Sequence, residues 1–117
     1  LIIKISPDLS NEDLNAIALN LTKFKIDGLI ATNTSVEHDH KLGNGGLSGK
    51  LLYKKSTETL KFMRKKLGKD FPIIASGGVM DIDSYKKKLD SGADLVQIYT
   101  GLIFYGPELI QDILNSD

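Results

Sequence analysis

The sequence predicts an α/β fold built from four strand-then-helix units, of the kind that make up a (β/α)8 TIM barrel. Four short apolar runs are each followed by a segment with the spacing of one helix face. The runs are apolar throughout rather than alternating, which is typical of parallel strands buried on both faces. A doubly wound sheet fits the same repeat. The polar residues after each run favour the barrel, because barrel active sites are built at the carboxyl ends of the strands.

The bulk composition is that of an ordinary soluble domain. The chain has 117 residues, of which 41% are hydrophobic and 26% charged, enough for one core. Fifteen basic residues balance fifteen acidic ones, so we expect no nucleic-acid partner. The sequence contains no cysteine, which excludes disulfides and thiolate metal sites. No apolar run is long enough to span a bilayer, and we expect a reducing, cytoplasm-facing compartment.

The first unit opens directly on apolar residues without an initiator methionine, and we therefore interpret the chain as a piece of a longer protein. The strand covers residues 1–5 and is broken by Pro7 and Asp8. Ser10 is placed to cap a helix, with Asp13 as its capping-box partner. The apolar face of this helix consists of Leu14, Ile17, Ala18, Leu21 and Phe24.

The second unit begins with a strand over residues 28–31 and continues in a polar, glycine-rich loop to about residue 55. A helix is predicted from near Ser56 to Gly68, where the glycine ends it. Its apolar face consists of Leu60, Met63 and Leu67.

The third and fourth units are shorter. The third has a strand over residues 72–75 and a helix capped by Asp81 and ended by Gly92. The fourth has a strand over residues 95–98. Its helix begins at Gly106-Pro107, because proline is favoured at the first helical position.

Small, polar or glycine residues lie at the end of every predicted strand, more often than turn formation requires. They are Lys4 and Ser6, Thr32 to Thr34, Ser76 to Gly78, and Tyr99 to Gly101. Lys4 lies within an apolar strand, and two interpretations have equal weight. In the first interpretation, its ammonium group points into the barrel and contacts an anion or another hydrogen-bond acceptor there. In the second, the side chain reaches solvent at a frayed terminus.

Two further segments carry groups that suit a ligand. Thr32, Asn33 and Thr34 offer hydroxyls and an amide that match a flat polar heterocycle, whereas helix capping is weakened because no helix pattern starts there. The loop 45–49 lets backbone N–H groups approach a ligand and adds the Ser48 hydroxyl. Such loops are common, and this one lacks the lysine spacing of a Walker A loop.

The glycines after the last two strands predict a phosphate site. If these strands are the seventh and eighth of a barrel, Gly77-Gly78 and Tyr99-Thr100-Gly101 occupy the habitual phosphate position. Backbone N–H groups, the Thr100 hydroxyl and a helix N-terminus would hold the phosphate. The alternative is two turns that need glycine for backbone reasons alone.

Two charged segments carry no predicted function. Glu37-His38-Asp39-His40 matches no metal-ligand spacing, so we interpret it as a solvated loop and predict no metal site. Lys86-Lys87-Lys88 is interpreted as a solvated helix face rather than a nucleic-acid patch.

Taken together, five segments resemble the quinone-dependent (class 2) dihydroorotate dehydrogenase family. Each segment alone is unspecific, but their order and spacing match along the whole chain. Tyr99-Thr100 and the opening Lys-Ile-Ser-Pro-Asp-Leu resemble the membrane-associated class, since the soluble class usually has glycine in place of Tyr99. The five segments are residues 4–9, 28–34, 45–50, 72–78 and 92–101.

The resemblance implies an FMN enzyme that oxidises dihydroorotate to orotate in de novo pyrimidine synthesis, with ubiquinone or menaquinone as the electron acceptor. It implies that residues 1–117 are the C-terminal half of an FMN-binding TIM-barrel domain. Lys4 would contact the flavin ring, and Asn33 and Thr34 would bind dihydroorotate. The remaining implied FMN contacts are Thr32, Ser48 and Gly49 along the flavin and Gly77, Gly78, Tyr99 and Thr100 at its phosphate.

The resemblance also implies what this chain lacks. The serine base and the quinone-binding helices would lie upstream, so no catalytic residue is expected here, and the chain alone is expected to be inactive and to self-associate. Leu51 stands where the family usually has proline. The parent is expected at the cytoplasmic face of a bacterial inner membrane, or at the mitochondrial inner membrane of a eukaryote, as a peripheral protein. The competing interpretations are a phosphate-binding βα module of another FMN or isomerase barrel, and a non-catalytic half-barrel.

Overall fold

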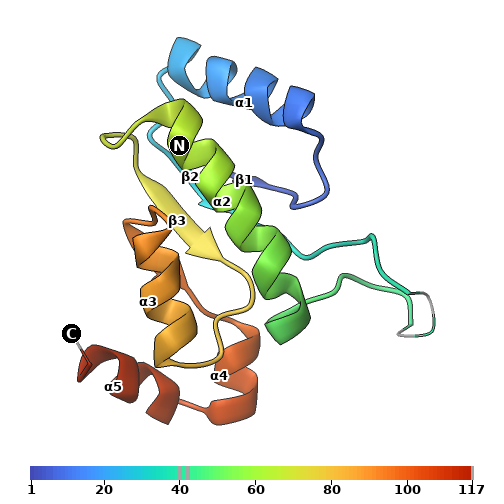
Figure 1. Cartoon of the computed structure of the whole chain (residues 1–117), viewed down its shortest axis with the longest axis vertical. Coiled ribbons are helices and arrows are strands. Elements are labelled where there is room, and N and C mark those ends of the chain that lie inside the picture. The colour runs from blue at the N-terminus through green and yellow to red at the C-terminus, as the bar shows by residue number, and fades with distance from the viewer. Residues whose placement is uncertain (40, 42, 117) are drawn as a thin grey trace.

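A computed structural model describes residues 1–39, 41 and 43–116 of the chain. Four parallel strands alternate with helices, as the sequence predicts (Figure 1). In chain order the elements are β1 (Ile2–Ile5), α1 (Asn11–Lys23), β2 (Gly28–Ala31), the 3-10 helix η2 (Gly49–Leu52), α2 (Tyr53–Leu67), β3 (Ile73–Ser76), α3 (Ile82–Asp90), β4 (Leu95–Gln97), α4 (Thr100–Tyr105) and α5 (Glu108–Leu114).

The strand order decides between the two α/β architectures. The strands lie side by side in sequence order, β1-β2-β3-β4, and every pair is parallel. A doubly wound sheet reverses its strand order at a switch point, whereas a barrel adds each strand next to the previous one. The structure is therefore four consecutive βα units of a (β/α)8 barrel, which confirms the predicted fold class.

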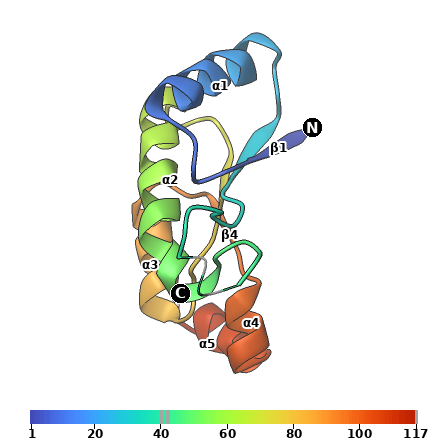
Figure 2. The same ribbon diagram turned by 90° about the vertical axis from the view of Figure 1, so that its right-hand side faces the viewer.

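The helices cover only one face of the sheet. Figure 2 shows α1, α2 and α3 along the same side of the strands. The side chains that point toward these helices form the core, with Leu29 and Ile73 fully buried against Leu60 and Met63 of α2. The buried residues of this cluster are Ile5, Leu14, Ala18, Leu21, Leu29, Ala31, Leu60, Met63, Ile73 and Ala75. Leu52, Val79, Leu109 and Ile113 are also buried.

The other face of the sheet, which corresponds to the inside of a barrel, is open. The strand register places Lys4, Ile30, Ile74 and Leu95 in one row on this face. Leu95 is 63% exposed. The expectation that all four strands are buried on both faces is therefore wrong for β1 and β4, because each is an edge strand over an uncovered face.

Most helix ends agree with the capping signals. Ser10 and Asp13 form the predicted capping box of α1, and Asp81 caps α3. The structure differs at α2, which begins at Tyr53 rather than near Ser56. It also differs at α4, a six-residue helix that was not predicted because no side chain caps it and its sequence continues the apolar fourth strand.

Candidate functional site

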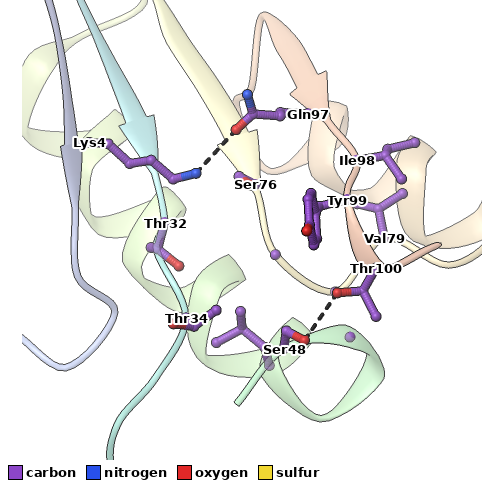
Figure 3. Close-up of a pocket in the computed structure, with 14 residues that line it drawn as sticks. Lys4, Thr32, Thr34, Ser48, Ser76, Val79, Gln97, Ile98, Tyr99 and Thr100 are labelled. Carbon is purple, nitrogen blue, oxygen red and sulfur yellow. Dashed lines mark hydrogen bonds between the residues drawn. The ribbon is translucent and has the colours of Figure 1, made fainter. Parts of the chain in front are cut away.

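A cavity of about 280 Å³ lies at the carboxyl ends of the four strands. Residues from every strand end and from the glycine-rich loop line it, so segments far apart in sequence meet here (Figure 3). The lining residues are Lys4, Thr32, Thr34, Ser48, Gly49, Leu52, Ser76, Gly77, Gly78, Val79, Gln97, Ile98, Tyr99 and Thr100. Of the ten ligand-binding residues predicted from the sequence, only Asn33 does not line this cavity.

Lys4 extends over the open face of the sheet. Its ammonium group donates a hydrogen bond to Gln97 Oε1 at 3.2 Å, linking β1 to β4 (Figure 3). Both side chains are exposed, and among the described residues no carboxylate pairs with Lys4. Lys4 therefore presents an uncompensated positive charge to the cavity. The sequence reasoning did not find Gln97, because an amide near a strand end carries no signal by itself.

Of the three residues that follow β2, Thr32 and Thr34 line the cavity and Asn33 does not. Thr32 is buried, and its hydroxyl donates to the Asn33 carbonyl oxygen at 2.8 Å. The Asn33 N–H donates to the Ile5 carbonyl oxygen at 2.7 Å, which holds this segment against the end of β1. Thr34 lines the cavity, whereas Asn33 is exposed beside it.

The glycine-rich loop folds back onto the strand ends. Ser35 and Leu47 pair through two backbone hydrogen bonds of 3.1 and 2.7 Å, which close the loop. Ser48 is thereby brought to the start of α4, and its hydroxyl accepts a hydrogen bond from Thr100 Oγ1 at 3.0 Å (Figure 3). Gly49 has φ +66° and packs so closely that an added Cβ would lie 3.1 Å from Thr100 Cγ2.

Gly77 and Gly78 are required both by backbone conformation and by packing. Their φ values are +108° and +84°, which L side chains rarely adopt. A Cβ on Gly78 would lie 2.4 Å from the Tyr53 Cα at the start of α2. Backbone conformation and packing therefore both require glycine at these positions, and both glycines also line the cavity wall.

The loops around the cavity are held by a charge cluster that the sequence reasoning missed. Lys55 on α2 forms ion pairs with Asp8, from the loop after β1, and with Glu37 at 2.6 Å. Asp8 also accepts hydrogen bonds from the Ser35 hydroxyl at 2.6 Å and the Val36 N–H at 2.8 Å. Burial alone would raise the pKa of Asp8, but the hydrogen bond from Lys55, followed by those from Ser35 and Val36, outweighs it and lowers the pKa.

Glu37, His38 and Asp39 do not line the cavity. His38 Nε2 lies 2.6 Å from the Gly45 carbonyl oxygen, and this hydrogen bond raises the pKa of the imidazole. His40 lies outside the described residues.

The interpretation of Lys86, Lys87 and Lys88 as one solvated face is wrong for Lys88. Lys86 and Lys87 are exposed, but the Lys88 side chain is completely buried. Its ammonium group donates to Ser56 Oγ at 2.7 Å. Successive helical residues are about 100° apart, so three in a row span about 200° and point in different directions. Charge alone does not reveal which of them faces the packed side.

Comparison with known proteins identifies the family. A family model described as dihydroorotate dehydrogenase matches residues 1–116. The chain belongs to the dihydroorotate dehydrogenase family. This membership confirms the resemblance and disfavours the alternative of a module from another FMN or isomerase barrel.

Dihydroorotate dehydrogenase relatives match nearly the whole chain. The "Dihydroorotate dehydrogenase (quinone)" of Dichelobacter nodosus is 48% identical over 98% of this chain. That of Haemophilus influenzae (strain 86-028NP) is 42% identical over 97%. A crystal structure of the Eimeria tenella enzyme in complex with ferulenol superposes with a TM-score of 0.93 at 35% identity, over 98% of this chain.

The chain spans only about a third of the length of these dihydroorotate dehydrogenases: 36% and 35% of the two bacterial relatives and 32% of the Eimeria protein. Within the described part of the chain, no helix has the length and apolarity needed to cross a membrane.

Proposed function

We propose that this chain supplies the C-terminal half of the FMN-binding barrel of a quinone-dependent dihydroorotate dehydrogenase, which oxidises dihydroorotate to orotate in pyrimidine synthesis. One observation carries the proposal. A single cavity gathers residues from all four strand ends, in a chain that matches the family over residues 1–116.

The polar groups around the cavity fit FMN. One side offers the ammonium group of Lys4 and the amide of Gln97, which suit the carbonyl-rich edge of an isoalloxazine ring. The other side offers the Ser48 and Thr100 hydroxyls and the backbone of Gly78, which suit a phosphate. When bound, FMN supplies the redox chemistry by accepting a hydride from the substrate.

Lys4 serves the ring end of this site. Its ammonium group is not paired with any described carboxylate, so its charge is free to stabilise negative charge that develops on a reduced flavin. Gln97 holds the long side chain over the open face. Thr32, buried directly after β2, lines the same cavity.

The phosphate end is formed by the segments after β3 and β4, together with the glycine-rich loop. Gly77 and Gly78 line the cavity wall, and Thr100 donates its hydroxyl proton to Ser48, which leaves the Ser48 hydroxyl able to donate to an anion. Tyr99, which is 76% exposed, contributes its backbone at the same rim.

Dihydroorotate lies next to Asn33 and Thr34 in this proposal. Thr34 lines the cavity directly. Asn33 is exposed directly beside Thr34, where its amide is open to a ligand. The serine that removes the substrate proton belongs to that missing half, together with the segment that receives ubiquinone or menaquinone. The parent protein is peripheral at a quinone-containing membrane, the cytoplasmic face of the inner membrane in bacteria or the mitochondrial inner membrane in eukaryotes.

The activity is tested on the purified full-length protein. We expect a yellow protein with bound FMN that reduces a short-chain quinone when dihydroorotate is added. Parallel assays with fumarate and with NAD⁺ separate the acceptor classes. Fumarate or NAD⁺ reduction at the quinone rate would contradict the quinone assignment, and a protein without flavin would contradict the FMN site.

A further inference from the structure

A buried cation lies directly behind the Gly77-Gly78 turn. Lys88 on α3 is the largest fully buried side chain of the described residues. Its ammonium group donates to Ser56 Oγ at 2.7 Å and lies 4.9 Å from the centre of the Tyr53 ring. Ser56 and Tyr53 belong to the first turn of α2, and α2 and α3 lie side by side on the covered face of the sheet (Figures 1 and 2).

The hydrogen bond continues from Ser56 to the turn. Ser56 Oγ lies 2.9 Å from the Gly77 carbonyl oxygen and 3.1 Å from the Tyr53 carbonyl oxygen. An ammonium group can only donate, so Lys88 occupies an acceptor position of the hydroxyl and directs the single hydroxyl proton toward these carbonyls. The Lys88 charge therefore fixes the rotation of the Ser56 hydroxyl.

The Gly77 carbonyl determines the direction of the next N–H group. The C=O and N–H of one planar trans peptide point in opposite directions. Because the Gly77 carbonyl points toward Ser56 on α2, the Gly78 N–H points away from α2. Gly77 and Gly78 both line the cavity, so this orientation turns the Gly78 N–H toward it.

Packing alone does not account for a lysine at this position. Among the described residues, no carboxylate forms an ion pair with Lys88. Burial lowers the pKa of its ammonium group to about 8. A methionine of similar length would fill the same volume without placing a charge in the interior.

We infer that Lys88 is a positioning residue of the phosphate site, acting through Ser56 and the Gly77 carbonyl to hold the Gly78 N–H toward an anion in the cavity. This inference rests on the proposed FMN site. Lys88 does not line the cavity, and it acts on the phosphate end of the site only.

The test compares two ligands that differ by the phosphate. The apo form of the full-length protein is titrated with FMN and with riboflavin, and the dissociation constants are read from quenching of flavin fluorescence. We expect Lys88→Met and Ser56→Ala each to weaken FMN binding about tenfold and to leave riboflavin binding unchanged. The double variant is expected to lose little more than either single variant, because both residues act in one chain of hydrogen bonds.

Lys87→Met is the matched control, since Lys87 is the exposed neighbour on the same helix and pairs only with Asp83 among the described residues. It is expected to keep the wild-type ratio of the two dissociation constants. Ser56→Ala removes only one hydroxyl, so it provides the test if Lys88→Met does not fold.

The outcomes separate this inference from the proposed function. Suppose that the wild-type protein binds FMN more tightly than riboflavin, and that the variants either keep this preference or lose affinity for both ligands equally. The positioning role of Lys88 would then be wrong, while the proposed FMN site would stand. A wild-type protein that binds FMN no more tightly than riboflavin would overturn the phosphate site itself, and the positioning role with it.

Discussion

The ammonium group of Lys4 lies 3.2 Å from Oε1 of Gln97, so the first and last strands of the sheet are joined across its open face. The two residues are 93 positions apart in the chain, and two other strands lie between β1 and β4. A contact of this length over one face requires a strongly curved sheet. The hydrogen bond therefore indicates that the sheet is curved like the wall of a barrel. It also places the Lys4 ammonium group on the face that corresponds to the inside of the barrel.

Replacing Lys4 by alanine in the full-length protein is expected to lower flavin content or turnover with little change in melting temperature. The side chain is exposed and contributes no core packing. Gln97→Leu is the companion variant, because it removes the partner and keeps the charge. Flavin absorbance, turnover and a melting curve are measured together. Normal turnover with a lowered melting temperature would make Lys4 a structural residue.

Asn33→Ala is expected to raise the Michaelis constant for dihydroorotate or to lower turnover, while FMN stays bound. Loss of one well-placed hydrogen bond to a polar ring costs about 0.5–3 kcal/mol, depending on charge. Thr34→Val is the matched variant inside the cavity. Unchanged kinetics for Asn33→Ala would remove this exposed residue from the substrate site.

Gly78→Ala is expected to destabilise the protein by several kcal/mol, since its Cβ would lie 2.4 Å from the Tyr53 Cα and backbone would have to move. Gly68→Ala is the control. Gly68 has φ +80° and ψ 176°, with nothing within 4 Å of an added Cβ, so it carries only the backbone cost, about 1–3 kcal/mol for a side chain in this glycine-favoured region. Urea unfolding of the two full-length variants compares these costs. Equal destabilisation would show that the turn is not packed against α2.

The buried Lys88 predicts a pH dependence of stability. Burial lowers its pKa to about 8 from 10.5, so between these values the unfolded chain binds more protons than the folded one. The free energy of unfolding should therefore rise with pH from about 8 to 10.5, by about 3 kcal/mol from this group.

The free energy of unfolding is measured by urea denaturation at several pH values for the full-length wild type and for Lys88→Met. The difference between the two proteins at each pH gives the contribution of Lys88. Lys86→Met should retain the wild-type dependence, because Lys86 is exposed. If the difference in unfolding free energy between wild type and Lys88→Met stayed constant from about pH 8 to 10.5, burial would not shift the pKa of Lys88.

The 117-residue chain by itself is expected to be inactive and to self-associate. β1 and β4 are edge strands with unpaired backbone groups. The open face and α4 expose large apolar side chains: Ile2, Leu95, Leu102, Ile103 and Phe104. Pairing of two copies would cover both edges, and a symmetric dimer is the simplest closed arrangement.

Size-exclusion chromatography with light scattering measures the association state. A well-folded monomer at micromolar concentration would contradict the edge argument. Dihydroorotate oxidation by this chain would contradict an upstream serine base.

The predicted elements agree with the structure wherever a local signal exists. The Ser10 and Asp81 caps and the Gly68 stop appear where their side chains or φ values act on their own helix ends. The start of α2 was misplaced because it continues from η2, and its N-cap position, Leu52, forms no side-chain cap hydrogen bond. The unpredicted helix α4 likewise lacks a capping side chain.

The sequence by itself determined four βα units, the polar strand ends and the family resemblance, because periodicity, capping and motif order are properties of neighbouring residues. Tertiary structure decided which polar residues meet. It turned Lys4 toward Gln97 and brought Ser48 to Thr100. It also buried Lys88 behind Gly77 while leaving Lys86 and Lys87 in solvent. These contacts depend on sheet curvature and helix packing, which bring together residues dozens of positions apart. Contacts of this kind produce no periodic pattern in the sequence, so the sequence alone does not predict them.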